Sequence, residues 1–470
     1  MTAKGSAALA ALLAALALLG CAHEATSPDL ARMYRTAAES PDTTPVIVIP
    51  GLFGSKLRNR VSGEQLWPGD YRRIAFSDYR DIELRFDPVS LAVLPDDVEA
   101  YDIADHVVGI DFYGRLIETL AKYGGYTKGT PGTPVHAGEK RYYIFAYDWR
   151  QDNVVHAAEL DRFIDQVRRD YGDPALRVDI VAHSMGGIVS RYYLRYGPVD
   201  VLDGAPSLIT LYGAQRVRKL ILLGTPNFGA VSSLHTYLRG ERIGFNRIMP
   251  DVIATMPSGY QLFPHPISAW LVDIDGAALS DDLFDPQTWK RYAWGIYDPA
   301  VEARIRESAG AQADARVAAL RRYFELRLER ARRLAWLLST PEPATPIRYV
   351  LFGGNCEPTP ARILVENEDG KPRARFLPDE VRNPKSGVPY EEVMREPGDG
   401  RVTKPSLLAR ETLDPTAPQH EESFLPIAYF FFLCERHDQL TGNVNFQDNL
   451  LNILLTRQLP WETMGPDAPK

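Results

Sequence analysis

A serine with a small residue two positions before it and another two positions after it lies between an apolar run and a helical stretch. The segment is Val181-Ala-His-Ser-Met-Gly-Gly187, so the serine is Ser184. A serine on a sharp strand-to-helix turn is held above the sheet as a nucleophile, and its neighbours must be small because strand and helix nearly touch. Ala182 meets this need where Gly is usual. The pattern predicts a nucleophilic Ser184; the alternative is a tight turn that merely contains a serine.

Two histidines are candidates for the base that activates the serine. With a serine of this kind the chain order is Ser, then Asp or Glu, then His. Of the nine His, only His420 and His437 come late enough. His437 follows an apolar run that ends at Leu433, and catalytic groups of open α/β sheets gather at the carboxyl ends of strands. We therefore predict His437 as the base, His420 as an exposed loop residue, and His183 as a residue that supports the turn.

The acid that orients the base is expected on a loop between the runs that end near Phe352 and start at Ile427. Asp399 lies there, in Gly398-Asp-Gly-Arg-Val402. Its two glycines let the backbone turn tightly, so that the carboxylate can reach an imidazole. A plain surface turn has the same local sequence. The competing acids are Asp369, Asp379 and Asp414.

Two backbone N–H groups are predicted to form an oxyanion hole. Met185 begins the helical stretch after the serine, and Leu52 lies in the turn Pro50-Gly-Leu-Phe-Gly54 that follows the first strand. Donors at these two places face the oxygen that becomes negative when an acyl carbonyl is attacked. The four features together predict acyl transfer through a covalent serine intermediate.

Short apolar runs that alternate with helical stretches would position these groups. The runs cover 46–49, 142–146, 177–182, 217–223, 347–352 and 427–433, and the helical stretches lie at about 112–123, 152–171 and 186–197. Continuous apolar runs are typical of parallel strands buried on both faces. The alternation predicts an α/β fold, with a mostly parallel sheet and helices on both faces.

Two insertions interrupt this alternation, one at about 56–110 and one at 230–345. In the second, apolar residues between 317 and 338 recur in steps of three and four, which is the stripe of an amphipathic helix. Large apolar residues interleaved with glycines over 230–264 favour a mobile lid, with a rigid subdomain as the alternative. The predicted organisation is a core in two parts, 45–229 and 346–460, separated by a helical cap.

The first 20 residues are typical of a secretory signal peptide. Lys4 precedes an uninterrupted run of Ala and Leu, too short to span a bilayer but suited to a signal-peptide core. The run ends in Leu18-Leu-Gly-Cys21, which resembles a bacterial lipobox, so Cys21 is predicted to carry lipid. Ala22 instead of Asp favours the outer membrane of a bacterial envelope, and 21–44 would be a tether. A plain signal peptide with a chance cysteine is the alternative.

Composition and charge exclude several classes of protein. The formal charge of −8 argues against a basic nucleic-acid binder, and three cysteines are too few for a disulfide-dense domain. The sequence has neither metal-ligand spacing nor a phosphate loop nor a dinucleotide motif, so no metal or cofactor is expected. Cys356 and Cys434 both follow strands, and either a disulfide between them or two separate thiols fits.

Several blocks resemble the lecithin:cholesterol acyltransferase and lysosomal phospholipase family of α/β-hydrolases, which has bacterial lipase relatives. The blocks are 46–57, Tyr147-Asp-Trp-Arg150, 182–187, Gly224-Thr-Pro-Asn-Phe-Gly229, Met256-Pro-Ser-Gly-Tyr-Gln-Leu-Phe-Pro264 and 398–402. The resemblance runs from about 45 to 456 and is weakest across 60–110 and 265–345. Arg401 stands where the family commonly has Thr. The resemblance implies an α/β-hydrolase fold and activity on acyl esters of lipids, and it favours Asp399 over its competitors.

The expected activity is hydrolysis of a lipid acyl ester by Ser184, Asp399 and His437, as in a lipase, phospholipase or esterase. A lipid alcohol in place of water would give an O-acyltransferase, because one acyl-enzyme serves both reactions. A catalytically dead lipid-binding envelope lipoprotein is the alternative from another class. Phe53 and Trp149 are predicted to line the substrate pocket, although a buried core position fits Trp149 equally well.

Overall fold

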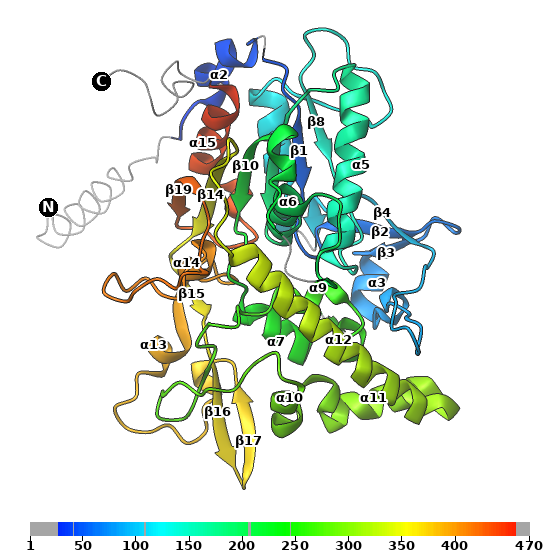
Figure 1. Cartoon of the computed structure of the whole chain (residues 1–470), viewed down its shortest axis with the longest axis vertical. Coiled ribbons are helices and arrows are strands. Elements are labelled where there is room, and N and C mark those ends of the chain that lie inside the picture. Colours follow the sequence, from blue (N-terminus) through cyan, green and yellow to red (C-terminus); the bar gives the residue numbers. More distant parts are fainter. Residues whose placement is uncertain (1–26, 41, 108–109, 205–207, 245, 457–470) are drawn as a thin grey trace, which may run out of the picture.

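A parallel sheet forms the centre of the molecule (Figure 1). The computed structural model describes residues 27–40, 42–107, 110–204, 208–244 and 246–456, so the predicted signal peptide and Cys21 lie outside the described residues. The strand order is β19-β14-β10-β9-β1-β8-β7, and each neighbouring pair is parallel. The strands are β1 (Val46–Ile49), β7 (Thr127–Lys128), β8 (Arg141–Ile144), β9 (Val178–His183), β10 (Val217–Leu223), β14 (Arg348–Gly354) and β19 (Ile427–Leu433).

All six predicted runs form strands of this sheet, and β7 is an addition. Its two residues are exposed and lie at the edge, so they give no apolar pattern in the sequence. The central strands β1 and β9 are buried along their whole length, which explains their continuous apolar composition.

Helices cover both faces of the sheet. α5 (Asn153–Tyr171) and α6 (Met185–Tyr196) pack on one face, where Ile47 and Ile49 of β1 point. α4 (Gly114–Glu118) and α15 (Val444–Leu455) pack on the other face, where Val46 and Val48 point. Side chains of a strand alternate between its faces, so one short run contributes to two cores. The predicted α/β-hydrolase fold class is confirmed.

The segment predicted as a tether contains a helix. α2 (Leu30–Ala38) is capped by Asp29, whose side chain accepts a hydrogen bond from the Arg32 N–H. Leu30 is buried against the core, and the Tyr34 hydroxyl donates to the Asp448 carboxylate of α15 at 2.6 Å. The predicted tether over 21–44 is therefore corrected for residues 30–38, whose few apolar side chains suffice because they pack against α15.

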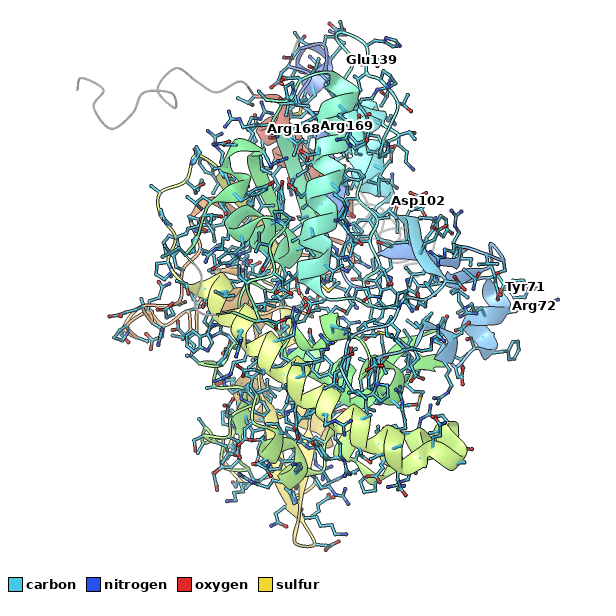
Figure 2. The ribbon with its side chains drawn as sticks, turned by 45° about the vertical axis from the view of Figure 1, so that its right-hand side comes forward. Tyr71, Arg72, Asp102, Glu139, Arg168 and Arg169 are labelled. Carbon is cyan, nitrogen blue, oxygen red and sulfur yellow. A yellow bond between two sulfur atoms is a disulfide. The ribbon has the colours of Figure 1, made fainter. Side chains whose placement is uncertain are left out.

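The insertion after β1 forms a small antiparallel sheet beside the main one. It contains β2 (Ser55–Asn59), β3 (Gln65–Trp67) and β4 (Val98–Ile103), in the order β3-β2-β4, and α3 (Tyr71–Phe76). Tyr71 and Arg72 of α3 project from the tip of this insertion (Figure 2). Its inner residue Trp67 is almost fully buried and reaches the wall of the cavity described below.

The second insertion is a largely helical cap at the carboxyl ends of the central strands. It contains α7 (Val231–Arg239), the hairpin β11 (Glu241–Ile243) and β12 (Asn246–Ile248), α8 (Pro250–Ile253), α9 (Pro257–Tyr260), β13 (Leu271–Val272), α10 (Pro286–Tyr292), α11 (Pro299–Ala309) and α12 (Ala313–Ser339). The predicted amphipathic stripe lies on α12, where Leu320, Phe324 and Leu328 are buried. Arg330 of α12 pairs with Asp152 and Asp200 of the core, so this side chain docks the cap onto the core.

A further segment between β14 and β19 joins the cap. It contains β15 (Glu357–Pro360), β16 (Ile363–Glu368), β17 (Lys371–Arg375), α13 (Tyr390–Met394) and β18 (Arg395–Gly398). β16 pairs in parallel with β13 of the cap, and β16 and β17 lie below the main sheet in Figure 1. Part of the expected second core part, 346–460, thus lies with the cap, and pairing between strands so far apart in the chain leaves no local pattern in the sequence. Within the part of the chain that the structure describes, every helix is too short or too polar to cross a bilayer.

Candidate active site

Ser184 lies on a strained turn between β9 and α6. Its φ is 52° and its ψ is −122°, a backbone conformation that non-glycine residues rarely adopt. The surroundings are crowded: a Cβ at Gly51 would lie 2.7 Å from the Ser184 Cβ, and one at Gly186 would lie 2.6 Å from the Pro50 carbonyl oxygen. The small residues around the serine are therefore required by the close approach of β1, as the motif predicts.

Asp399 and His437 form a hydrogen-bonded pair. The His437 Nδ1 atom lies 2.8 Å from Oδ2 of Asp399, and the His437 backbone N–H donates to the Asp399 carbonyl oxygen, also at 2.8 Å. Oδ1 of Asp399 accepts the N–H groups of Arg401 at 2.9 Å and Val402 at 2.7 Å. The carboxylate is fully buried, so its orientation is fixed by these donors.

The other candidates for acid and base lie elsewhere. Asp369, Asp379 and Asp414 are exposed, and His420 is exposed as predicted. The structure therefore brings together one acid and one base out of the sequence candidates, and these are the pair that the chain order and the family resemblance favour.

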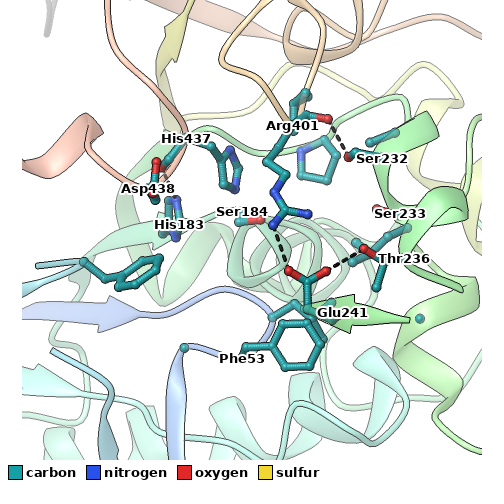
Figure 3. A pocket seen from close by; sticks show the side chains of 18 of the residues that line it. Phe53, His183, Ser184, Ser232, Ser233, Thr236, Glu241, Arg401, His437 and Asp438 are labelled. Carbon is teal, nitrogen blue, oxygen red and sulfur yellow. Dashed lines mark hydrogen bonds and ion pairs between the residues drawn. The ribbon is translucent and has the colours of Figure 1, made fainter. Parts of the chain in front are cut away.

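Ser184 and His437 line one cavity of about 470 Å³ (Figure 3). Most of its wall is apolar, which suits an acyl chain. The apolar side chains include Leu52, Phe53, Trp67, Phe112, Ile243, Ile253, Met256 and Leu262. Phe53 therefore lines the pocket as predicted from sequence, and Trp67 does so without any signal in its local sequence.

Trp149 lies behind this wall, which corrects its prediction as a pocket residue. It is fully buried, its Nε1–H donates to the Ser55 carbonyl at 3.0 Å, and its ring meets Phe53 edge-on with centroids 4.7 Å apart. Trp149 thus supports Phe53 and does not contact the space in front of Ser184.

Two backbone N–H groups are available near Ser184. Neither the Leu52 amide nor the Met185 amide has an acceptor among the residues that the structure describes. Met185 is the first residue of α6, whose opening N–H groups lack partners within the helix. Unpaired N–H groups at these two places are what an oxyanion hole requires.

A buried hydrogen-bond chain connects the predicted oxyanion turn to the loop of His437. The Gly51 N–H donates to the Tyr113 hydroxyl at 2.9 Å, and that hydroxyl lies 2.8 Å from Nδ1 of His183. His183 Nε2 lies 3.2 Å from the His437 carbonyl oxygen. Burial lowers the pKa of the His183 imidazole well below its usual value. A neutral ring that accepts at Nδ1 and donates at Nε2 satisfies all of these contacts.

Replacing Tyr113 by Phe is expected to weaken this chain. The Gly51 N–H and His183 Nδ1 would both lose a buried partner, at a cost of about 1–3 kcal/mol in the free energy of unfolding. A looser oxyanion turn should also lower kcat by roughly tenfold, which is about 1.4 kcal/mol in the barrier. Urea unfolding and esterase kinetics measure the two effects. Wild-type values for both would show that the hydroxyl is dispensable. The control is Tyr123→Phe, at the last residue of the helical segment that follows Tyr113.

A charged pair at the rim of the cavity was not foreseen from sequence. Arg401 Nη2 lies 2.8 Å from Oε1 of Glu241, and the Thr236 hydroxyl donates to the other carboxylate oxygen at 2.7 Å (Figure 3). Burial opposes ionisation of Glu241, but Arg401 and Thr236 outweigh it and lower the pKa of the carboxyl. The charge of Glu241 likewise raises the pKa of Arg401. The pair ties the β11–β12 hairpin of the cap to the loop that carries Asp399.

The two remaining cysteines are joined in the structure. Cys356, just after β14, and Cys434, just after β19, form a disulfide with their Cα atoms 5.0 Å apart. Among the described residues no group of His, Cys, Asp and Glu side chains is arranged to hold a metal ion.

The chain is similar to lipid acyl-ester enzymes over its middle part. Residues 137–286 match the model of the lecithin:cholesterol acyltransferase family. The lysosomal phospholipase A and acyltransferase of Rattus norvegicus is 25% identical over 215 residues, 45% of this chain and 41% of that protein. The protein of the same name from Bos taurus is 27% identical over 156 residues, 32% of this chain and 31% of that one. The chain thus matches about two fifths or less of these relatives' length.

A solved structure shares the fold over most of the chain. The Tle4-Tli4 complex contains a chain with a TM-score of 0.54 and 16% sequence identity to this one. The match covers 88% of this chain and 98% of that one. At this identity the likeness extends to the fold alone.

Proposed function

We propose that this α/β-hydrolase, which is similar to the lecithin:cholesterol acyltransferase family, cleaves acyl esters of lipids through an acyl-enzyme on Ser184. The observation that carries the proposal is the joint geometry of the site: a serine on a strained turn and a hydrogen-bonded His437–Asp399 pair line one apolar cavity. Similarity to the lecithin:cholesterol acyltransferase family supports an acyl ester as the substrate.

In the proposed first half-reaction, Ser184 Oγ attacks the ester carbonyl carbon and His437 Nε2 takes the hydroxyl proton. Asp399 accepts the Nδ1–H of His437, which keeps Nε2 free as a base and stabilises the charged ring. The N–H groups of Leu52 and Met185 donate to the oxyanion, and each such donor typically contributes about 3 kcal/mol. His437 then returns the proton to the departing alcohol, and the acyl group remains on Ser184.

In the second half-reaction, His437 Nε2 removes a proton from water, and the water oxygen attacks the acyl carbon of the acyl-enzyme. The C–O bond to Ser184 then breaks, His437 returns the proton to Ser184 Oγ, and the fatty acid leaves. A lipid alcohol could take the place of water, and the name of the mammalian relatives, phospholipase A and acyltransferase, favours this as the second candidate. Incubating the protein with a labelled phospholipid and a long-chain alcohol distinguishes the two. We expect mainly free fatty acid; a labelled ester as the main product would instead support the acyltransferase.

A fluorophosphonate probe tests whether the site is catalytic at all. Only an activated serine reacts with it, so we expect one adduct, on Ser184, identified by peptide mass spectrometry. A folded protein that binds lipid but takes up no probe would contradict the proposal and support a catalytically inactive lipid-binding lipoprotein.

The proposal places the enzyme at a bacterial envelope membrane through lipid on Cys21. Growth with labelled palmitate should give a labelled protein that Cys21→Ala abolishes, and fractionation should recover it with the outer membrane. Unlabelled protein in the soluble periplasmic fraction would contradict this.

The β11–β12 hairpin is proposed to act as a lid over the acyl chain. Ile243 lines the cavity, and the Glu241–Arg401 pair holds the hairpin against the acid loop. Replacing 241–248 by a short Gly-Ser link should lower turnover of long-chain esters about tenfold, the equivalent of two buried CH₂ groups at about 0.8 kcal/mol each. Turnover of acetate and butyrate esters should change less than about twofold, because short chains do not reach the hairpin. Equal losses for both chain lengths, with the fold intact, would make the hairpin a scaffold.

A further inference from the structure

The Cys356–Cys434 disulfide lies where two neighbouring strands separate. Gly354 of β14 and Leu433 of β19 are the last residue pair in register between these strands. Beyond this pair, one segment runs through Cys356 into β15, and the other runs through Cys434 to His437. The disulfide therefore links two segments at the point where the sheet stops holding them together.

The segment after Cys434 carries His437, and the segment after Cys356 pairs with the strand that leads to Asp399. β15 pairs with β18, which ends immediately before Asp399, and Glu357 and Asp399 themselves form a bridge. On the other side, His437 follows three residues after Cys434. The segments are in close contact, because a side chain at Gly354 would collide with the Glu435 carbonyl and the Asp399 side chain.

Hydrogen bonds hold the same two segments without covalent help. The His437 N–H donates to the Asp399 carbonyl at 2.8 Å, and the Asn355 N–H donates to the Leu433 carbonyl at 3.1 Å. The pairing of β14 with β19 in the parallel sheet is made by backbone hydrogen bonds and does not depend on the disulfide. Breaking the S–S bond should therefore leave the protein folded while the His437 segment gains freedom relative to Asp399.

Both cysteines are exposed, so a thiol reductant can reach them. We propose that this disulfide positions His437 against Asp399, so that its reduction by a dithiol slows acyl transfer without unfolding the protein. This rests on the proposed function. In the reduction, one thiolate attacks a protein sulfur, the S–S bond breaks, and the second thiolate closes a cyclic disulfide. Cys356 and Cys434 gain two electrons and two protons, and the dithiol is oxidised.

The experiment compares oxidised, reduced and reoxidised protein with the double variant Cys356→Ser/Cys434→Ser, all with Cys21→Ser so that no third thiol exchanges. We expect reduction to lower kcat on p-nitrophenyl butyrate about tenfold, because small misplacements of a catalytic base are costly. KM should change less than twofold, and reoxidation should restore kcat. The double variant should have the low kcat and no response to reductant, while circular dichroism remains that of the folded protein.

A spectroscopic readout follows the pair itself. The proton between His437 Nδ1 and Asp399 should give a low-field resonance in oxidised protein that broadens on reduction. Full kcat in protein whose free thiols are verified by mass, or loss of kcat only together with global unfolding, would overturn the positioning role. Failure of the proposed function would appear differently, as oxidised protein that does not label at Ser184, and the resonance would still report on the pair.

Discussion

Replacing Ser184 by Ala is expected to lower kcat on a p-nitrophenyl ester by about 10⁶-fold, the scale seen when the nucleophile of such a triad is removed. The change deletes one oxygen and keeps the Cβ, which is the atom that a side chain at Gly51 would meet. Ala also has a Cβ, so the backbone strain at a φ of 52° is about the same in both proteins. The free energy of unfolding should therefore shift by about 0.5 kcal/mol or less. The loss of activity would therefore come from the chemistry and not from unfolding.

Ser386→Ala is the matched control, because Ser386 lies on an exposed loop away from the cavity. It should keep wild-type kcat and KM. An Ser184→Ala protein that still turns over the ester at the wild-type rate would remove Ser184 from the mechanism, and a fluorophosphonate adduct on another serine would identify its replacement.

Asp399→Asn is expected to lower kcat by about 10⁴-fold, with KM nearly unchanged. The two backbone N–H groups of Arg401 and Val402 can still be accepted by the Asn oxygen, so the loop should keep its shape. The new amide group would face His437 Nδ1, where Oδ2 now lies, and would donate to it. The ring would then carry its proton on Nε2 and could not accept the proton of Ser184.

Asp414→Asn tests the same substitution at a competing acid. Asp414 accepts the Thr416 N–H on an exposed loop, and Asn can replace it there. Wild-type activity is expected for Asp414→Asn. If Asp399→Asn kept its activity while Asp414→Asn lost it, the acid would have been assigned to the wrong loop.

The sequence alone determined the parts of the site whose signals are local. The run before Ser184 has the pattern of a buried strand, the residues two positions before and after it are small, and a helical stretch follows, so the turn could be predicted from sequence. Chain order then left His420 and His437, and the position of His437 directly after an apolar run favoured it as the base. The local sequence did not identify Asp399 as the acid, since Gly-Asp-Gly is equally typical of a surface turn. Only the family resemblance favoured Asp399 over Asp414.

Tertiary structure decided everything that depends on which distant segments meet. The Tyr113 hydroxyl reaches Gly51 across 62 residues and His183 across 70, and the Arg401–Glu241 pair spans 160. It also moved Trp149 behind the pocket wall, chose a disulfide over two free thiols, and turned part of the expected tether into α2. A side-chain pattern records how a segment alternates between core and solvent. Which distant segment packs against the buried face of that segment is decided only when the whole chain folds.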